Sequence, residues 1–289
     1  MGGIVYRVQI QVGDFMNTFF KDSVVVVTGG ASGIGKEIVN QIVPSGAKVI
    51  IVGRSAKTGK EFAKDLKHRG FVIDFEHVDM VDEKKVERMV NAIVKKYGRI
   101  DYMFNNAGIF MGGEIRDTKL ENWHKVMNNN IFATINGTHY VYQQMLKQGN
   151  GHIVNVASAA GLIPVPGMGI YGATKFAIVG LTHALRNEAK SLGVKVSAVC
   201  PTVINTPLYD TAIYNKVDTK KALKTRKALQ TPELAAKRIL RGVRRNKATI
   251  HTAFSSHATW VLYRIAPRLY DFGARRVVNI YREKLRASS

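Results

Sequence analysis

The sequence predicts an α/β fold, in which a doubly wound parallel sheet is covered by helices on both faces, giving three layers in a single domain. Two observations carry this prediction. Short apolar runs alternate with longer polar segments of helical periodicity, as in repeated strand-helix-strand units. The chain has 289 residues, of which 46% are hydrophobic and 22% charged, which suits one large globular unit.

The expected elements follow one another from Ser23 to about Asn246. The first strand begins at Val24, and the first helix ends near Val43. Thr231 and Pro232 form a capped start for the last helix of this series. The strands expected in order are 24–27, 48–52, 71–78, 102–104, 152–156 and 194–199, and the later helices are 82–97, 120–146, 171–192 and 231–246. The crossovers between them should be right-handed.

The charge is concentrated near the C-terminus. Of the formal net charge of +22, residues 216–289 carry +15, and aromatic residues alternate with arginines beyond Thr252. No apolar run approaches the roughly 20 residues of a membrane-spanning helix. Cys200 is the only cysteine, which excludes an internal disulfide and a multi-cysteine zinc site, so no metal is expected. Residues 1–20 lack a secretory design, and a cytoplasmic protein is expected.

A glycine-rich turn, Thr28–Gly35, lies between the first strand and the first helix. Glycines allow a tight turn and close approach to a pyrophosphate, whose charge meets the free N–H groups at the helix start. Up to Lys36, the segment also resembles a P-loop, the loop that binds the phosphates of nucleoside triphosphates. Glu37 then stands where that loop needs a hydroxyl for magnesium, so we reject this alternative.

Three further residues suggest proton-transfer chemistry. Tyr171 and Lys175 lie four positions apart and therefore on one helix face. A nearby ammonium is expected to lower the pKa of the Tyr171 phenol from its usual value of about 10. Ser158 follows a strand end and can hydrogen-bond a substrate oxygen.

Together these motifs resemble the short-chain dehydrogenase/reductase family over about residues 21–252. The resemblance rests on the glycine spacing, the stretch Asn105–Gly108, Ser158 thirteen residues before Tyr171, and the spacing of Tyr171 and Lys175. It implies a Rossmann-type fold, hydride transfer between a nicotinamide cofactor and a CH-OH group, and association into a homodimer or homotetramer. It implies that Asn130 holds a water that passes protons to Lys175, completing the catalytic set with Ser158 and Tyr171.

The cofactor is expected to be NADP(H) rather than NAD(H). An acidic residue usually ends the second strand of NAD-selective sites, whereas this chain has Arg54, which suits a 2′-phosphate. Ser32 departs from the basic residue that NADP-binding members of the family often carry, and Thr202 replaces a usual glycine. The resemblance implies that the cofactor-binding residues are Thr28, Gly29, Ser32, Gly33, Ile34, Gly35, Arg54, Asp79, Asn106, Ala107, Gly108, Tyr171, Lys175, Ile204 and Thr206.

The segment 159–170 contains no charged residue, and in the family this segment borders the substrate. This favours a lipophilic substrate, a carbonyl or alcohol of steroid, retinoid or fatty-acyl type, and a role in lipid metabolism. Residues 253–289 are expected to form a basic helical extension that acts as a lid, a dimer contact or a peripheral anchor on an anionic membrane.

The alternative to an oxidoreductase is a non-catalytic NADP(H)-binding scaffold or sensor at a membrane or nucleic-acid surface. Nucleic-acid binding is disfavoured because no recognition motif accompanies the charge. Alternating apolar residues in 4–12 suggest an added strand, a tag remnant or an upstream start, and the extension 1–20 receives no role.

Overall fold

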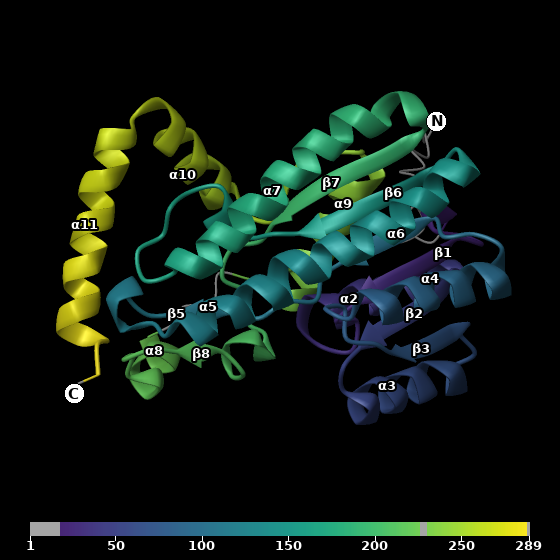
Figure 1. Ribbon diagram of the computed structural model, residues 1–289, viewed down its shortest axis with the longest axis horizontal. Helices are drawn as coiled ribbons and strands as arrows, with labels where there is room; N and C mark the ends of the chain where they lie inside the picture. The colour runs from purple at the N-terminus through teal and green to yellow at the C-terminus, as the bar shows by residue number, and fades with distance from the viewer. Residues whose placement is uncertain (1–17, 226–229, 288–289) are drawn as a thin grey trace, which may run out of the picture.

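The computed structural model describes residues 18–225 and 230–287, so the expected strand in residues 4–12 lies outside the described part. Its main feature is a seven-stranded, fully parallel sheet in the order β3-β2-β1-β4-β6-β7-β9 (Figure 1). The strands are β1 Val24–Thr28, β2 Lys48–Gly53, β3 Ile73–His77, β4 Tyr102–Asn105, β6 Gly151–Val156, β7 Val194–Cys200 and β9 Thr249–His251, with a small pair β5 Met111–Gly112 and β8 Ile213–Tyr214.

Helices cover both faces of the sheet, which confirms the three-layer prediction (Figure 1). The strands are buried on both sides: Val25 and Val27 face one core cluster, and Val24 and Val26 face the other. This explains why the strands are continuous apolar runs. The first cluster includes side chains from α2 Gly33–Ile42, α3 Ala56–His68 and α9 Pro232–Arg244, and the second includes side chains from α4 Glu83–Tyr97, α6 Ala133–Gln148 and α7 Gly169–Ala189.

The order of the strands reverses at β1. From β1 the chain first builds outward to β2 and β3, and then returns to β4 on the other side. In doubly wound sheets, such a reversal opens a crevice at the carboxyl ends of the two central strands. Thr28 and Asn105 end β1 and β4 at this point, next to the glycine turn.

Two parts of the fold differ from the expected elements. The expected helix 120–146 is divided into α5 Leu120–Met127 and α6 by a π-helical turn, Asn128–Phe132. The helices α3 and α8 Thr219–Thr225 and the strands β5, β8 and β9 were not predicted. For α3 a signal was present, because Ser55 caps the Thr58 N–H and Ala63 and Leu66 supply a buried face.

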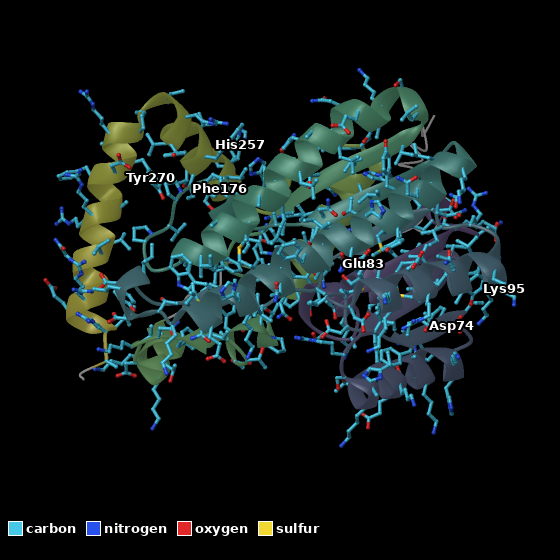
Figure 2. All side chains as sticks on the ribbon, in the orientation of Figure 1. Asp74, Glu83, Lys95, Phe176, His257 and Tyr270 are labelled. Atoms are coloured by element: carbon cyan, nitrogen blue, oxygen red, sulfur yellow. The ribbon has the colours of Figure 1, made fainter. Side chains whose placement is uncertain are left out.

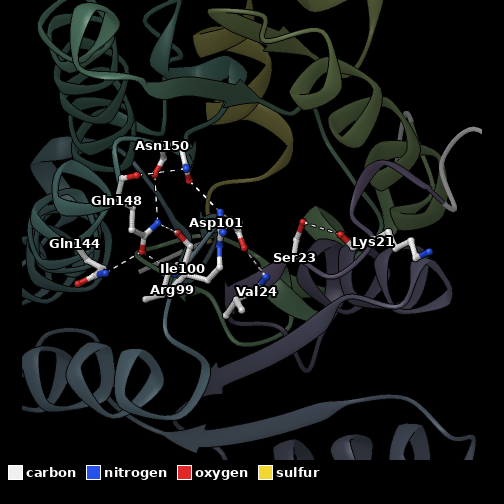
Figure 3. A network of polar contacts seen from close by, with 9 residues as sticks. All are labelled: Lys21, Ser23, Val24, Arg99, Ile100, Asp101, Gln144, Gln148 and Asn150. Carbon is white, nitrogen blue, oxygen red and sulfur yellow. Dashed lines mark hydrogen bonds and ion pairs between the residues drawn. The ribbon is translucent and has the colours of Figure 1, made fainter.

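A polar network ties the amino ends of β1, β4 and β6 together, opposite the crevice (Figure 3). Asp101 Oδ2 accepts a hydrogen bond from Val24 N at 2.8 Å, and Arg99 donates to Asp101 Oδ1. Gln148 closes the network by accepting from Ile100 N and donating to Ile100 O, both at 2.9 Å. Phe20 packs in the adjacent core with its ring 4.8 Å from that of Tyr102, so the packed domain includes Phe20.

The C-terminal extension is helical, as predicted, with α10 Phe254–Ile265 and α11 Pro267–Lys284. The helix α10 packs on the body through Trp260, whereas α11 buries none of its residues and lies at the edge of the molecule (Figure 1). Glu114 pairs with Arg282 at 2.7 Å, and Asp117 pairs with Arg286 at 3.1 Å, which attaches the end of the chain. Within the described residues, no helix is long and apolar enough to cross a membrane.

Candidate active site

The crevice contains two adjoining hollows, and together they bring most of the predicted site residues into one place. The larger, of about 510 Å³, follows the carboxyl ends of β1, β2 and β4. The smaller, of about 80 Å³, lies deeper. The predicted residues lining the larger hollow are Gly29, Ser32, Gly33, Ile34, Arg54, Asp79, Asn106, Ala107, Gly108 and Thr206. Those lining the smaller hollow are Ile34, Asn106, Gly108, Ser158, Tyr171, Lys175, Ile204 and Thr206.

The glycine turn has the conformation that its sequence suggests. Gly29 and Gly33 have backbone φ values of 63° and 50°. Residues other than glycine rarely adopt this left-handed conformation. A Cβ at Gly35 would collide with the carbonyl oxygen of Gly29, so this glycine lets α2 pack against the turn. Ser32 precedes α2 without a side-chain cap, which leaves the first N–H groups of the helix available to an anion.

Thr28 and Asn106 hold the turn from beneath. Thr28 Oγ1 accepts hydrogen bonds from the backbone N–H groups of Asn106 and Ala107, both at 2.9 Å. The Asn106 side chain donates to the carbonyl of Thr28 at 3.0 Å. Thr28 does not line either hollow and therefore acts as a support of the turn.

Arg54 reaches a partner that the sequence analysis did not identify. Its Nη1 donates to Asn129 Oδ1 at 2.7 Å, and its carbonyl oxygen bonds to His77. Both Arg54 and Asn129 line the larger hollow, so they mark one of its walls together. Asp79 lies on the same hollow with Oδ1 3.1 Å from Val81 N.

Asn130 is fully buried in the π-helical turn. Its side chain donates to the carbonyl of Ile109 and to Thr174 Oγ1, both at 3.1 Å, and accepts from Ile109 N at 2.8 Å. These bonds fix the loop that follows β4. The Asn130 side chain has no direct bond to Lys175, although a Cβ at Gly108 would lie 3.0 Å from Asn130 Oδ1 and 3.6 Å from Lys175 Nζ.

Ser158, Tyr171 and Lys175 meet in the smaller hollow. Tyr171 and Lys175 come from the first turns of α7, and Ser158 comes from the turn after β6. Lys175 is 5% exposed, and its Nζ donates to the carbonyl of Val156 at 3.0 Å. Burial lowers the pKa of Lys175 to about 8. Ser158 Oγ accepts from Ala160 N at 3.2 Å and also bonds to the Tyr171 hydroxyl.

The pKa of Tyr171 differs from the expectation. Burial and the neighbouring Tyr209 raise it above the usual value, and only the hydrogen bond with Ser158 lowers it. Lys175 Nζ lies 5.6 Å from the centroid of the Tyr171 ring and bonds to Val156 instead of the phenol. The prediction that Lys175 lowers this pKa is therefore wrong for this structure, in which the phenol is held neutral.

The segment after β7 accommodates Thr202 without strain. Apart from glycines, only Asp22, Lys216 and Asn246 have a positive φ among the described residues, so the replacement of the usual glycine by Thr202 requires no left-handed backbone. Sequence reasoning missed several lining residues, which carry no motif and are apolar or aromatic. They are Ile109, Val156, Ala157, Pro201, Leu208 and Tyr209. No group of three or more His, Cys, Asp or Glu in the described chain is arranged to hold a metal ion.

The fold and this site define a dinucleotide-binding α/β oxidoreductase. The family model for short chain dehydrogenase matches residues 23–216, and the chain belongs to this family. This confirms the resemblance, and members of the family bind a nicotinamide cofactor.

Relatives and solved structures agree with this assignment. The chain is 40% identical over 182 residues to an uncharacterized oxidoreductase of Thermotoga maritima, covering 63% of this chain and 72% of that protein. It is 30% identical to SadH of Mycobacterium tuberculosis, described as an oxidoreductase, covering 87% of this chain and 94% of that protein. A short chain dehydrogenase/reductase from Burkholderia phymatum, solved with NAD, superposes with a TM-score of 0.80 at 25% identity, covering 86% and 95% of the two chains.

Proposed function

We propose that this oxidoreductase transfers hydride between NADP(H) and a carbonyl or alcohol of a lipophilic substrate, with Tyr171 as the general acid/base. The observation that carries the proposal is the convergence of Ser158, Tyr171 and Lys175 on one small hollow next to the dinucleotide-sized crevice. A protein that only bound the cofactor would need the crevice but not these three residues.

The crevice fits a nicotinamide dinucleotide. The positive φ values of Gly29 and Gly33 and the uncapped start of α2 provide a cradle for a pyrophosphate, and the larger hollow continues from there past Arg54 and Asp79. When bound, the nicotinamide supplies or accepts the hydride. Ile204 and Thr206 are expected to contact its carboxamide end, because both line the smaller hollow beside Tyr171.

The protein itself handles the proton. A neutral Tyr171 phenol can donate its proton to a carbonyl oxygen that becomes an alcohol, and the reverse reaction returns that proton. Ser158 is placed to hydrogen-bond the same oxygen and keep it beside the phenol. Lys175 places a positive charge next to this hollow, and Asn130 positions the loop of Ile109 and Gly108 that closes it.

The variant Tyr171→Phe tests the catalytic assignment. It should reduce turnover by roughly 10² to 10⁴-fold, the usual contribution of general acid–base catalysis, while NADPH binding and the melting temperature are retained. Tyr214→Phe is a matched control, because its hydroxyl bonds to the carbonyl of Tyr209 and does not line the smaller hollow. Turnover near the wild-type level in Tyr171→Phe would refute the assignment. Tight NADPH binding without turnover of any tested carbonyl would favour a scaffold or sensor.

An apolar hollow of about 490 Å³ supports a lipophilic substrate. It lies between the uncharged loop before α7 and the helix α11, and Tyr270 bridges the two by donating to the carbonyl of Pro164 at 2.5 Å. Its lining includes Val165, Met168 and Phe176. A panel of ketosteroids, retinal, long-chain 3-oxoacyl compounds and small aldehydes tests this proposal. Activity confined to small polar carbonyls would contradict it.

The exposed residues of α10 and α11 favour a peripheral contact with an anionic membrane. Ile265, Leu269 and Phe272 are 77%, 60% and 67% exposed, and arginines flank them at 264, 268, 275 and 276. Apolar side chains next to basic ones suit a lipid interface. Because α11 buries none of its residues and is held by a few polar contacts, such as Arg282 with Glu114, deletion from Pro267 should leave a folded protein that no longer sediments with anionic vesicles.

The double variant Leu269→Ser/Phe272→Ser gives a sharper version of the membrane test, with Leu192→Ser as a control that removes an exposed leucine elsewhere. Only the double variant should lose vesicle binding. If full-length protein does not sediment with anionic vesicles at low salt, α11 is a lid or a dimer contact. We further propose that the protein is cytoplasmic and forms a homodimer or homotetramer. The exposed apolar Phe132 and Ile135 support the association, which analytical ultracentrifugation tests.

A further inference from the structure

A fourth hollow, of about 570 Å³, lies between α9, β9 and α10, and shares no lining residue with the two hollows of the active site. Its walls are formed mainly by basic and aromatic side chains, the rest being small or aliphatic, and no acidic residue is among them. The residues that line it are Arg238, Arg241, Gly242, Arg245, Lys247, Thr249, Ile250, His251, Ala253, Phe254, His257 and Trp260.

The arginines come from one face of α9 and its end. Arg238, Arg241 and Arg245 are spaced by three and four residues, which places them on the same side of the helix. None of the three, nor Lys247, forms an ion pair with an acidic side chain in the described chain. The Arg238 guanidinium is anchored by a bond to the carbonyl of Thr252. Like charges at such spacing repel one another, so the hollow favours an anion.

The opposite wall is a cluster of three rings. His251 Nε2 lies 3.4 Å from His257 Nδ1, and both rings lie within 6 Å of the Trp260 ring, with centroid distances of 5.9 and 5.7 Å. Figure 2 labels His257 on α10, where this helix lies beside the body. His251 Nδ1 is buried without a hydrogen-bond partner in the described structure. Burial, with smaller contributions from the nearby His257 and Lys247, lowers the pKa of His251 to about 4, so this imidazole is neutral near pH 7.

We propose that this hollow binds the phosphate group of a phosphorylated ligand. Guanidinium groups match phosphate oxygens in paired, charge-assisted hydrogen bonds, and Arg241 and Arg245 have no other side-chain partner in the described structure to compete with such a ligand. A volume of about 570 Å³ exceeds what a bare phosphate needs and matches small-ligand pockets. The remainder of the ligand would lie against Trp260 and Phe254, and Phe254 is 84% exposed.

The position of the hollow links it to the catalytic centre. Trp260 belongs to its wall and also packs against the core cluster that contains Ala157 and Cys200. Ala157 directly precedes Ser158 in the chain, and Cys200 lies against the Ser158 backbone. The shared phosphate chemistry has two sources, a soluble phosphate ester or the phosphomonoester headgroup of a lipid. The experiment distinguishes them.

The test uses full-length protein and inorganic pyrophosphate as the soluble probe, followed by calorimetric titration and thermal unfolding. The variant Arg241→Gln/Arg245→Gln should bind pyrophosphate at least about tenfold more weakly than wild type. Lys84→Gln/Arg88→Gln is the matched control, since it removes two exposed charges spaced four apart on α4. Any binding of pyrophosphate at the start of α2 persists in both variants, so only the difference between them reports this hollow.

The second arm measures sedimentation with phosphatidylcholine vesicles, with and without phosphatidic acid. Pyrophosphate binding that is lost only in Arg241→Gln/Arg245→Gln supports a soluble phosphate ester. Binding to phosphatidic acid vesicles alone, again lost only in this variant, supports a lipid headgroup. The proposal is overturned if neither probe binds, or if the variant and its control lose binding equally. The ligand-free melting temperatures of both variants verify that the proteins are folded.

Discussion

His152 provides a quantitative test of the packing at the amino end of β6, opposite the active site. It is 3% exposed on β6, and its Nε2 lies 2.9 Å from Ser197 Oγ. Ser197 Oγ donates its own proton to the carbonyl of Lys247 at 2.6 Å, so the proton between the two side chains belongs to His152 Nε2. Burial, together with the positive charges of Lys195 and Arg186, lowers the pKa of His152 to about 3.

The sign of the pH effect follows from this lowered pKa. In the unfolded chain His152 titrates near 6.5, whereas in the folded chain it stays neutral down to about pH 3. Well above pH 6.5 neither the folded nor the unfolded state binds the proton, so His152 does not change the free energy of unfolding with pH. As the pH falls below 6.5, only the unfolded state gains a proton, so the free energy of unfolding falls by about 1.36 kcal/mol per pH unit. Between pH 6.5 and 4.5 the loss from this residue is roughly 2 kcal/mol.

Urea unfolding at a series of pH values measures this loss, with His152→Gln as the reference. Glutamine keeps an N–H donor for Ser197 but does not titrate, while all other groups remain as they are. The free energy of unfolding should therefore fall more steeply with acid in wild type than in the variant, by roughly 2 kcal/mol over this window. The comparison uses slopes and tolerates a constant difference in stability. Equal slopes would refute the assignment of a neutral, buried His152.

The cofactor crevice supports further predictions. Arg54→Ala should weaken NADPH binding by roughly 1.5 to 3 kcal/mol with little effect on NADH binding, because it removes a charged hydrogen-bond donor to the 2′-phosphate. Fluorescence titration measures the affinity for both cofactors. Equal losses for both, or a preference of the wild type for NADH, would contradict the prediction. Gly35→Ala should destabilise the fold by about 1 to 3 kcal/mol and weaken both cofactors, since its Cβ would meet the Gly29 carbonyl and lie 2.6 Å from Asn106 Nδ2. Gly180→Ala is the control, because nothing lies within 4 Å of a Cβ there, and a similar loss in both would show that the turn is not tightly packed.

Local patterns were sufficient to predict the fold and to single out the three residues that meet in the smaller hollow. Strands buried on both faces are largely apolar, so β1 and β2 are visible as runs of valine and isoleucine. The glycines of the first turn are needed for backbone reasons that act over a few residues. Tyr171 and Lys175 share a helix face because of the helical period alone. Each of these features depends on neighbours along the chain, and the sequence therefore displays it directly.

Contacts between distant segments were decided only by the tertiary structure. Arg54 meets Asn129, 75 residues away, because the π-helical turn directs Asn129 toward the end of β2. The pKa of Tyr171 depends on how completely the surrounding segments remove water from the phenol, and spacing to Lys175 does not measure this.

The basic hollow between α9, β9 and α10 also could not be predicted from the sequence. Its arginines are visible in the sequence as part of a general positive charge. Their grouping around His251 and Trp260 depends on the docking of α10 against the last strand of the sheet. Burial and long-range proximity are properties of the packed chain, because they arise from which surfaces exclude water together, and no local pattern encodes them.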